Sequence, residues 1–273
     1  MKQTHSNSKN RGTLIIIGGS EDKTDEMEIL KEVAQHTHKN KMVVVTIASN
    51  HPEELWADYR KIFNRLGVKN ISHFSIEEHQ EARDPENIKI FDDAHTVFFS
   101  GGDQLKVTSK IGGTPVIEKI KDIYRKGGLI AGTSAGAAIM GKMMLVGNPR
   151  EEIHKVGDWH MAPGLGFVED MIVDQHFAQR GRIGRLLGAV AQNPGILGIG
   201  IDEDTAIVVK DDSFKVIGAN AAYVIDGRFV SNTNVSEATA NETMSVHGLH
   251  LHILANKETF TLSTREIQNV RRT

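Results

Sequence analysis

The chain has 273 residues, a formal net charge of −3 and no cysteine. The near-neutral charge argues against a nucleic-acid partner, and the lack of cysteine excludes disulfides, thiolate zinc sites and a cysteine nucleophile. No run of about 18 apolar residues occurs, so we expect no membrane span and a cytoplasmic protein. The length suits one large α/β domain, and we expect a flexible tail over residues 1–12 and a single hydrolytic domain over residues 13–273.

In the N-terminal half, β-branched runs alternate with segments of helical periodicity. The predicted strands are residues 13–17, 42–48, 71–76 and 96–99, and the predicted helices are residues 23–38, 52–66 and 87–93. Another helix is predicted to begin at Pro115, with Thr114 as its N-cap and Gly127 after its last turn. This alternation predicts an α/β fold with a mostly parallel sheet flanked by helices, of the flavodoxin-like kind.

The C-terminal half is richer in strands. The predicted strands are residues 171–173, 196–201, 206–209, 214–217, 222–225 and 249–254, with one helix over about residues 182–192. Residues 210–213 are predicted to connect two of these strands as a hairpin. We therefore expect a β-rich C-terminal part attached to the parallel sheet.

Residues 132–136 read Gly-Thr-Ser-Ala-Gly and directly follow the apolar run 128–131. A serine on a tight strand-to-helix turn is crowded by neighbouring backbone, which favours glycine on both sides. The pattern predicts a nucleophile elbow with Ser134 as nucleophile, and the alternative is a glycine-rich strand exit without chemistry. Gly136 to Lys142 nearly matches a phosphate-binding loop, but Met143 stands where that loop requires a magnesium-binding hydroxyl.

A serine nucleophile needs a base and an acid that orients the base. Among 13 histidines, His176 is the candidate base because it ends an apolar strand and precedes a glycine-broken polar loop; the alternative is a core or turn histidine. Asp202 and Glu203 follow another apolar strand. Either could orient the base, or the two could form only a charged turn.

Other residues near these positions are candidates for binding. Arg180, Arg182 and Arg185 carry guanidinium groups suited to planar carboxylates, and the alternative is a solvated helix face. Gly101 and Gly102 follow a strand and offer backbone N–H groups for a developing oxyanion, with the polar Gln104 beside them. The alternative is an ordinary strand-to-helix turn.

Two further groups have simpler interpretations. The histidines at positions 247, 250 and 252 raise the question of a metal site, but no carboxylate pattern accompanies them, so no metal or cofactor is expected. Glu21 and Asp22 are interpreted as negative charges at the N-terminus of a helix.

Five blocks of sequence, taken together, resemble the cyanophycinases, serine peptidases related to dipeptidase E with a class I glutamine-amidotransferase-like fold. The blocks are Gly18–Lys23, Ser100–Gln104, Gly132–Ala137, Asp174–Arg185 and Ile201–Ala206. The resemblance implies Ser134 as nucleophile, His176 as general base and Glu203 as its acid. It implies an oxyanion hole formed by the amides of Ala135 and of Gly101 or Gly102. The residues implied to line the substrate cleft are Gln104, Asp174, Gln175, Arg180, Arg182 and Arg185.

The family cleaves cyanophycin, a polyaspartate with an arginine on each β-carboxyl, to β-Asp-Arg dipeptides through an acyl-enzyme. The resemblance thus implies this polymer as the binding partner, an exopeptidase activity without cofactor, and a homodimer. Family members often carry alanine where this chain has Ser20, which is a small departure. Two alternatives stay open: an aspartyl or isoaspartyl dipeptidase of the same fold, and a non-enzymatic small-molecule binding module.

Overall fold

The computed structural model describes residues 11–147, 155, 159–240 and 242–268. Most of the predicted tail, residues 1–10, lies outside this range. At the beginning of the described chain, the Gly12 amide donates a hydrogen bond to the Tyr124 carbonyl at 2.7 Å. The first strand starts at the next residue, so the chain is attached to the fold from Gly12 onward.

Within the described residues, the larger sheet has nine strands in the order β17-β16-β11-β10-β1-β5-β4-β2-β3. Their bounds are β1 Thr13–Ile17, β2 Lys41–Val45, β3 Ile71–Phe74, β4 Ala94–Phe99, β5 Leu129–Thr133, β10 Thr205–Lys210, β11 Ser213–Gly218, β16 Thr259–Thr261 and β17 Glu266–Gln268. Strands β1 to β5 pair in parallel, whereas β10, β11, β16 and β17 extend the sheet in antiparallel fashion. The predicted α/β class is confirmed, and the β-rich C-terminal part supplies the antiparallel strands.

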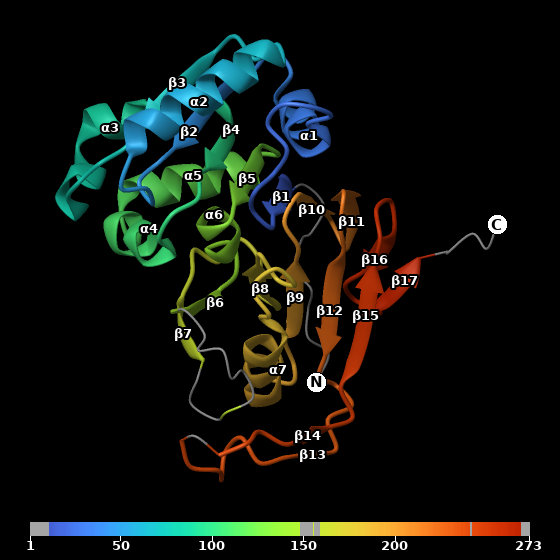
Figure 1. Ribbon diagram of the computed structural model, residues 1–273. Helices are drawn as coiled ribbons and strands as arrows, with labels where there is room; N and C mark the ends of the chain where they lie inside the picture. Colours follow the sequence, from blue (N-terminus) through green and yellow to red (C-terminus); the bar gives the residue numbers. More distant parts are fainter. Residues whose placement is uncertain (1–10, 148–154, 156–158, 241, 269–273) are drawn as a thin grey trace.

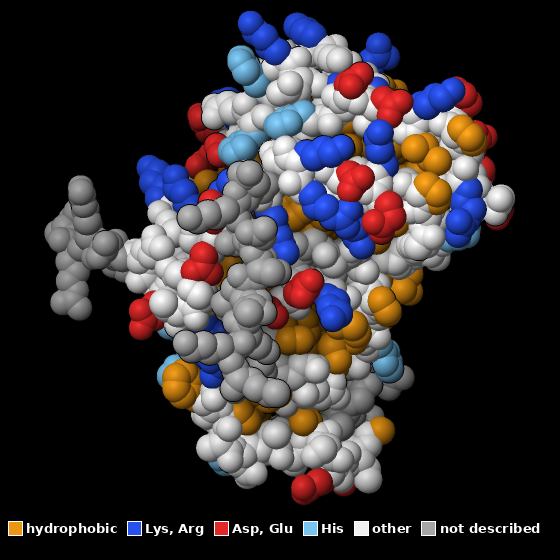
Figure 2. Space-filling model, turned by 180° about the vertical axis from the view of Figure 1, so that it is seen from behind, with side chains coloured by type: hydrophobic (Ala, Val, Ile, Leu, Met, Phe, Trp, Pro, Cys, Tyr) orange, Lys and Arg blue, Asp and Glu red, His pale blue; other side chains and the backbone are white. Residues whose placement is uncertain are grey.

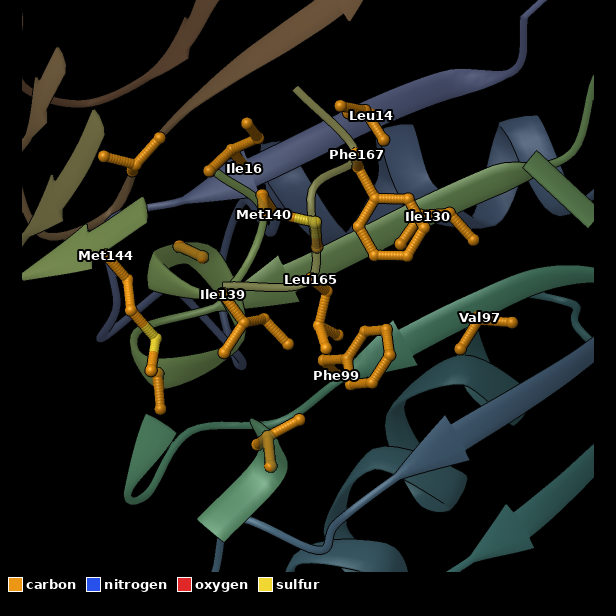
Figure 3. Packing of buried hydrophobic residues seen from close by; sticks show 14 of the residues in the cluster. Leu14, Ile16, Val97, Phe99, Ile130, Ile139, Met140, Met144, Leu165 and Phe167 are labelled. Atoms are coloured by element: carbon orange, nitrogen blue, oxygen red, sulfur yellow. The ribbon is translucent and has the colours of Figure 1, made fainter. Parts of the chain in front are cut away.

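Helices cover both faces of the parallel strands (Figure 1). The helical elements are α1 Glu28–Thr37, α2 Pro52–Arg65, α3 Pro85–Lys89, α4 Gln104–Ile111, α5 Pro115–Arg125 and α6 Ala135–Ala138, with a 3-10 turn at His79–Arg83. Alternate strand residues point to opposite faces. One set packs with α1 and α2, and the other packs with α4, α5 and α6. Figure 3 shows the second cluster, where Phe99 and Ile130 from the sheet meet Ile139 and Met140 beyond the Ser134 turn.

A smaller sheet lies beside the larger one, in the order β15-β12-β9-β8. Its strands are β8 Met171–Gln175, β9 Leu197–Ile201, β12 Ala222–Asp226 and β15 His250–Leu254, and helix α7 spans Ile183–Gln192. One face of this sheet joins the core of the larger sheet, and α7 packs on the other face. The remaining strands form two small antiparallel pairs, β6 Met143–Val146 with β7 His160–Pro163 and β13 Asn232–Thr233 with β14 Val246–His247.

Several element boundaries differ from the predictions for local reasons. The helix predicted over residues 23–38 begins only at Glu28, because the Asp22 carboxylate accepts hydrogen bonds from the amides of residues 24, 25 and 27 and holds a turn there. Thr114 does occupy an N-cap position, but its hydroxyl donates to the Ile111 carbonyl at 2.7 Å instead of capping the helix. No prediction covers strands β6, β7, β13, β14, β16 and β17 or helix α4.

The surface seen from behind carries basic and acidic side chains intermingled over its upper part (Figure 2). This distribution agrees with the small net charge of −3. Among the described residues, no helix combines the length and the hydrophobicity needed to cross a bilayer.

Candidate active site

The exit of strand β1 joins the three segments that carry Ser134, His176 and Glu203. The consecutive carbonyls of residues 17, 18 and 19 each accept one amide hydrogen bond: from Ser134 at 3.1 Å, from His176 at 2.8 Å and from Asp204 at 2.9 Å. Because backbone atoms are held more rigidly than side chains, these bonds place the three segments in a defined arrangement. Gly18 and Gly19 begin one of the five blocks of resemblance, but their role as a junction follows only from the tertiary structure.

Ser134 lies on the turn between β5 and α6. Its backbone has φ 54° and ψ −110°, a sparsely populated conformation that costs on the order of 1–3 kcal/mol. The flanking glycines are required by close packing: a β-carbon on Gly132 would lie 2.2 Å from the Gly136 carbonyl oxygen, and one on Gly136 would lie 2.4 Å from that of Phe99. The turn therefore presents Ser134, half-buried, at the carboxyl end of a parallel strand.

Ser134, His176 and Glu203 form a continuous chain of hydrogen bonds. The distance between Ser134 Oγ and His176 Nε2 is 2.9 Å, and the distance between His176 Nδ1 and Glu203 Oε1 is 2.6 Å. Asp202 does not take part: its Oδ1 accepts from the Ala178 amide at 2.9 Å and its Oδ2 accepts from the Tyr223 hydroxyl at 3.4 Å. Of the two carboxylates that the sequence left open, Glu203 is thus the one that contacts the histidine.

The surroundings of His176 favour its neutral form. Desolvation is the largest effect and lowers the pKa of His176 below its ordinary value of 6.5, while the hydrogen bond to Glu203 acts in the opposite direction. A neutral imidazole with Nδ1–H donated to a carboxylate leaves Nε2 as an acceptor. His176 can therefore accept the Ser134 proton at neutral pH.

The amides proposed for the oxyanion lie next to Ser134. A β-carbon built on Gly101 would lie 3.4 Å from Ser134 Cβ and 3.9 Å from its Oγ, so Gly101 borders the hydroxyl directly. Ala135 is the first residue of α6, where an amide has no acceptor within its own helix. Within the described residues, the amides of Gly101, Gly102 and Ala135 donate no hydrogen bond outside regular helix and strand bonding.

The predicted binding residues fall into two groups. Arg180 is exposed beside the site, whereas Asp174, Arg182 and Arg185 are almost completely buried, with 1%, 3% and 3% of their surface accessible. Asp174 Oδ2 accepts from Arg185 Nε at 2.6 Å, and its Oδ1 accepts from Arg182 Nη1 at 3.2 Å and from Arg185 Nη2. The alternative of a solvated helix face is therefore wrong for Arg182 and Arg185, because their guanidinium groups pair with a buried carboxylate.

This buried group carries more positive than negative charge. Two guanidinium groups share the single Asp174 carboxylate, and burial is the main reason that the pKa of Arg182 falls to about 10. Arg182 nevertheless stays charged at neutral pH. Gln175, also buried, accepts from Arg182 Nη1 through its backbone carbonyl at 2.6 Å. The Gln104 amide group donates to the Leu145 carbonyl at 2.9 Å, which ties α4 to β6.

Two other sequence interpretations can be compared with the structure. Glu21 is not a charge at a helix terminus, because α1 begins only at residue 28 and the Glu21 side chain is buried against Tyr59 and Thr133. Glu21 lies two residues after Gly19, and no local pattern in the sequence indicates that it is buried. His250 stacks on the Phe229 ring at 4.1 Å between centroids, and the described residues contain no group of three or more histidine, aspartate or glutamate side chains arranged to hold a metal ion.

Comparisons with known proteins agree with this architecture. A family model, described as peptidase family S51, matches residues 14–217. A cyanophycinase from Trichormus variabilis is 38% identical over 258 residues, covering 93% of this chain and 87% of the relative. A cyanophycinase from Synechococcus elongatus is 33% identical over 272 residues, covering 98% of this chain and 84% of the relative. A third, from Geminocystis herdmanii, is 34% identical over 260 residues, with coverage of 94% and 96%.

Two solved structures share the fold. A peptidase from an acI-B1 actinobacterium has a TM-score of 0.67 at 22% identity, covering 92% of this chain and 97% of its own. A putative peptidase E from Listeria monocytogenes has a TM-score of 0.52 at 15% identity, covering 77% and 100%. The family model spans well over half of the chain, and the relatives are similar along nearly all of it. The chain therefore belongs to peptidase family S51 and is a serine peptidase.

Proposed function

We propose that this peptidase is a cyanophycinase, an exopeptidase that releases β-Asp-Arg dipeptides from the polymer. The observation that carries the chemistry is the hydrogen-bonded chain of Ser134, His176 and Glu203. The substrate is supported by relatives described as cyanophycinases, which are 33% to 38% identical over nearly the whole chain.

In the proposed mechanism, His176 Nε2 takes the proton of Ser134 Oγ as the hydroxyl attacks the α-peptide carbonyl between two aspartates. The amides of Ala135 and of Gly101 or Gly102 stabilise the resulting oxyanion. The protonated His176, stabilised by Glu203, then donates its proton to the leaving amine, and the acyl-enzyme forms. A water molecule, deprotonated by His176, hydrolyses the ester and restores Ser134.

The positive charges around the site support a cationic anchoring point for the carboxylates of the substrate. Arg180 is exposed and available for a bidentate contact with a carboxylate of the polymer. Arg182 and Arg185 are paired with Asp174, so we propose that they contribute mainly a positive field and the shape of the cleft wall, while Arg180 makes the direct contact.

The test is incubation of the purified protein with insoluble cyanophycin and, separately, with free β-Asp-Arg, following turbidity and identifying the products by mass spectrometry. Clearing of the suspension with accumulation of β-Asp-Arg is the expected result. Intact polymer together with cleavage of the free dipeptide would contradict the proposal and indicate an isoaspartyl dipeptidase. The Ser134→Ala protein is the control, since it should bind the polymer without clearing it.

A further inference from the structure

Glu21 is a buried carboxylate that the chain of Ser134, His176 and Glu203 does not use. It follows the exit of β1, and only 4% of its surface is exposed. Its Oε1 accepts a hydrogen bond from the Tyr59 hydroxyl at 2.6 Å, and its Oε2 accepts one from the Thr133 hydroxyl at 2.6 Å. The two oxygens thus connect helix α2 to the end of strand β5.

The surroundings of this carboxylate keep it satisfied. A buried charge is unfavourable unless it is hydrogen-bonded and paired. Within the described residues, Lys23 is the cation that lies within 4 Å of the Glu21 carboxylate, with its Nζ 3.7 Å from Oε1. The same Nζ lies 4.7 Å from the centroid of the Tyr59 ring. Burial, followed by the charge of Glu21, raises the pKa of Tyr59, so the hydroxyl keeps its proton and remains a donor.

The link to the active site is Thr133, the residue directly before Ser134. Ser134 has the unusual backbone of φ 54° and ψ −110°, which persists only where the surrounding structure holds it. Its amide is held by the Ile17 carbonyl at 3.1 Å, and the preceding side chain is held by Glu21. The two acceptors, the Ile17 carbonyl and the Glu21 carboxylate, belong to β1 and the residues that follow it. Thr133 and Ser134 are therefore both held by the same segment.

We propose that Glu21 is a positioning residue that, together with Tyr59, holds Thr133 and thereby keeps Ser134 Oγ aimed at His176 Nε2. The inference rests on the proposed role of Ser134 as nucleophile. A misplacement of about 1 Å at a reacting atom can lower turnover by about a hundredfold. Loss of the Thr133 contact should therefore reduce catalysis although no residue of this cluster touches the substrate.

The chain offers a matched control in the same sheet. Thr96 is a fully buried threonine in β4 whose hydroxyl accepts from Thr37 at 2.9 Å. It pairs with Leu129, at the opposite end of β5 from Thr133. Thr133→Val and Thr96→Val make the same chemical change. The first lies next to the proposed nucleophile, and the second lies level with the opposite end of strand β5. Thr133→Ser keeps the hydroxyl and serves as the conservative rescue.

The experiment measures the melting temperature, kcat and KM on cyanophycin, and the rate at which a fluorophosphonate labels Ser134. The variants are Thr133→Val, Thr133→Ser, Thr96→Val, Tyr59→Phe and Glu21→Gln. The kinetic measurements are made well below the lowest melting temperature of the set. We expect Thr133→Val to lower kcat and the labelling rate together by about tenfold to a hundredfold, with KM within about twofold of the original. Tyr59→Phe and Glu21→Gln should act in the same direction, while Thr133→Ser and Thr96→Val should keep the original kcat.

Equal kcat and labelling rates for Thr133→Val and Thr96→Val, with both proteins merely less stable, would overturn the positioning role. Labelling is independent of the substrate. If the original protein is labelled at Ser134 but leaves cyanophycin intact, the substrate proposal fails, and the labelling rates of the variants still decide the role of Glu21. If the original protein is not labelled at Ser134, both proposals fail.

Discussion

The Oε1 atom of Glu203 lies 2.6 Å from the Nδ1 atom of His176, on the opposite side of the imidazole from Ser134. This contact fixes which ring nitrogen carries the proton, and it separates Glu203 from its neighbour Asp202. Asp202 instead accepts from the Ala178 amide. Two adjacent carboxylates therefore have different hydrogen-bond partners, and substitution can test whether their roles differ as well.

The substitution Glu203→Gln should lower kcat by about a hundredfold to 10⁴-fold, because an amide stabilises neither the correct tautomer nor the imidazolium as well as a carboxylate does. The matched change Asp202→Asn keeps an oxygen that can accept from the Ala178 amide, so kcat should stay within about threefold. Steady-state kinetics of both variants provide the check. A larger loss for Asp202→Asn than for Glu203→Gln would reverse the assignment.

Removal of the proposed nucleophile should abolish turnover while leaving the fold intact. Ser134→Ala should lower kcat by at least about 10⁴-fold. The melting temperature should not fall, since Ser134 is half-buried and, among the described residues, His176 is the one partner of its hydroxyl. Ser72→Ala, on strand β3 at the edge of the sheet, is a control that should retain activity. Turnover by Ser134→Ala at the original rate would disprove the role of Ser134.

The activity should depend on the protonation of His176. Burial lowers the pKa of His176 below 6.5, and only the neutral form accepts the serine proton. The value of kcat/KM should therefore stay level from pH 8 down to about 6.5 and fall below it, with a midpoint under the ordinary histidine value. The same shift means that the unfolded chain binds this proton first as the pH drops, so His176 contributes a loss of stability below pH 6.5. A midpoint in kcat/KM above pH 7 would contradict the assignment.

Gly19 should tolerate no side chain. A β-carbon there would lie 2.4 Å from Cε1 and 2.5 Å from Nε2 of His176, and its φ of +103° disfavours any other residue. Gly19→Ala should therefore displace the imidazole and lower kcat by about a hundredfold or more. Gly67→Ala is a useful control, since it also has a positive φ of +93° but nothing lies within 4 Å of the added carbon. Equal activities of the two variants would show that His176 can move without consequence.

Arg180 and Arg185 should respond differently to truncation. Arg185→Ala leaves the buried Asp174 with one partner fewer and should destabilise the protein by about 3–5 kcal/mol. Arg180→Ala, at an exposed position, should leave the melting temperature unchanged and raise KM for cyanophycin. Thermal denaturation and steady-state kinetics on both variants test this. An unchanged KM for Arg180→Ala would argue against its contact with the substrate.

Local patterns were sufficient for most of the fold. The alternation of β-branched runs with helical periodicity predicted β1, β2, β4, α2 and α5, because burial of alternate strand residues and of one helix face constrains the residue types directly. Strands β6 and β7 carry no comparable pattern: residues 143 to 146 are all apolar, without alternation, and residues 160 to 163 read His-Met-Ala-Pro. The late start of α1 at Glu28 depends on an Asp22 turn that competes with the helix, and such local competition is weakly marked in sequence.

The fold class, the family and the residue types of the candidate site could be predicted from the amino-acid order alone, because glycine spacing, strand ends and apolar runs are local properties of the chain. Which groups meet depends on how distant segments pack. Ser134 and His176 are 42 residues apart, and Thr133 and Glu21 are 112 residues apart. Strands β1, β5, β8 and β9 end together, and the decisive contacts arise there. They are the contact of His176 with Glu203 and not Asp202, the burial of Arg182 and Arg185 against Asp174, and the contact of Glu21 with Thr133. Adjacent carboxylates are equivalent in a sequence, and only the packing of distant segments gives them different partners.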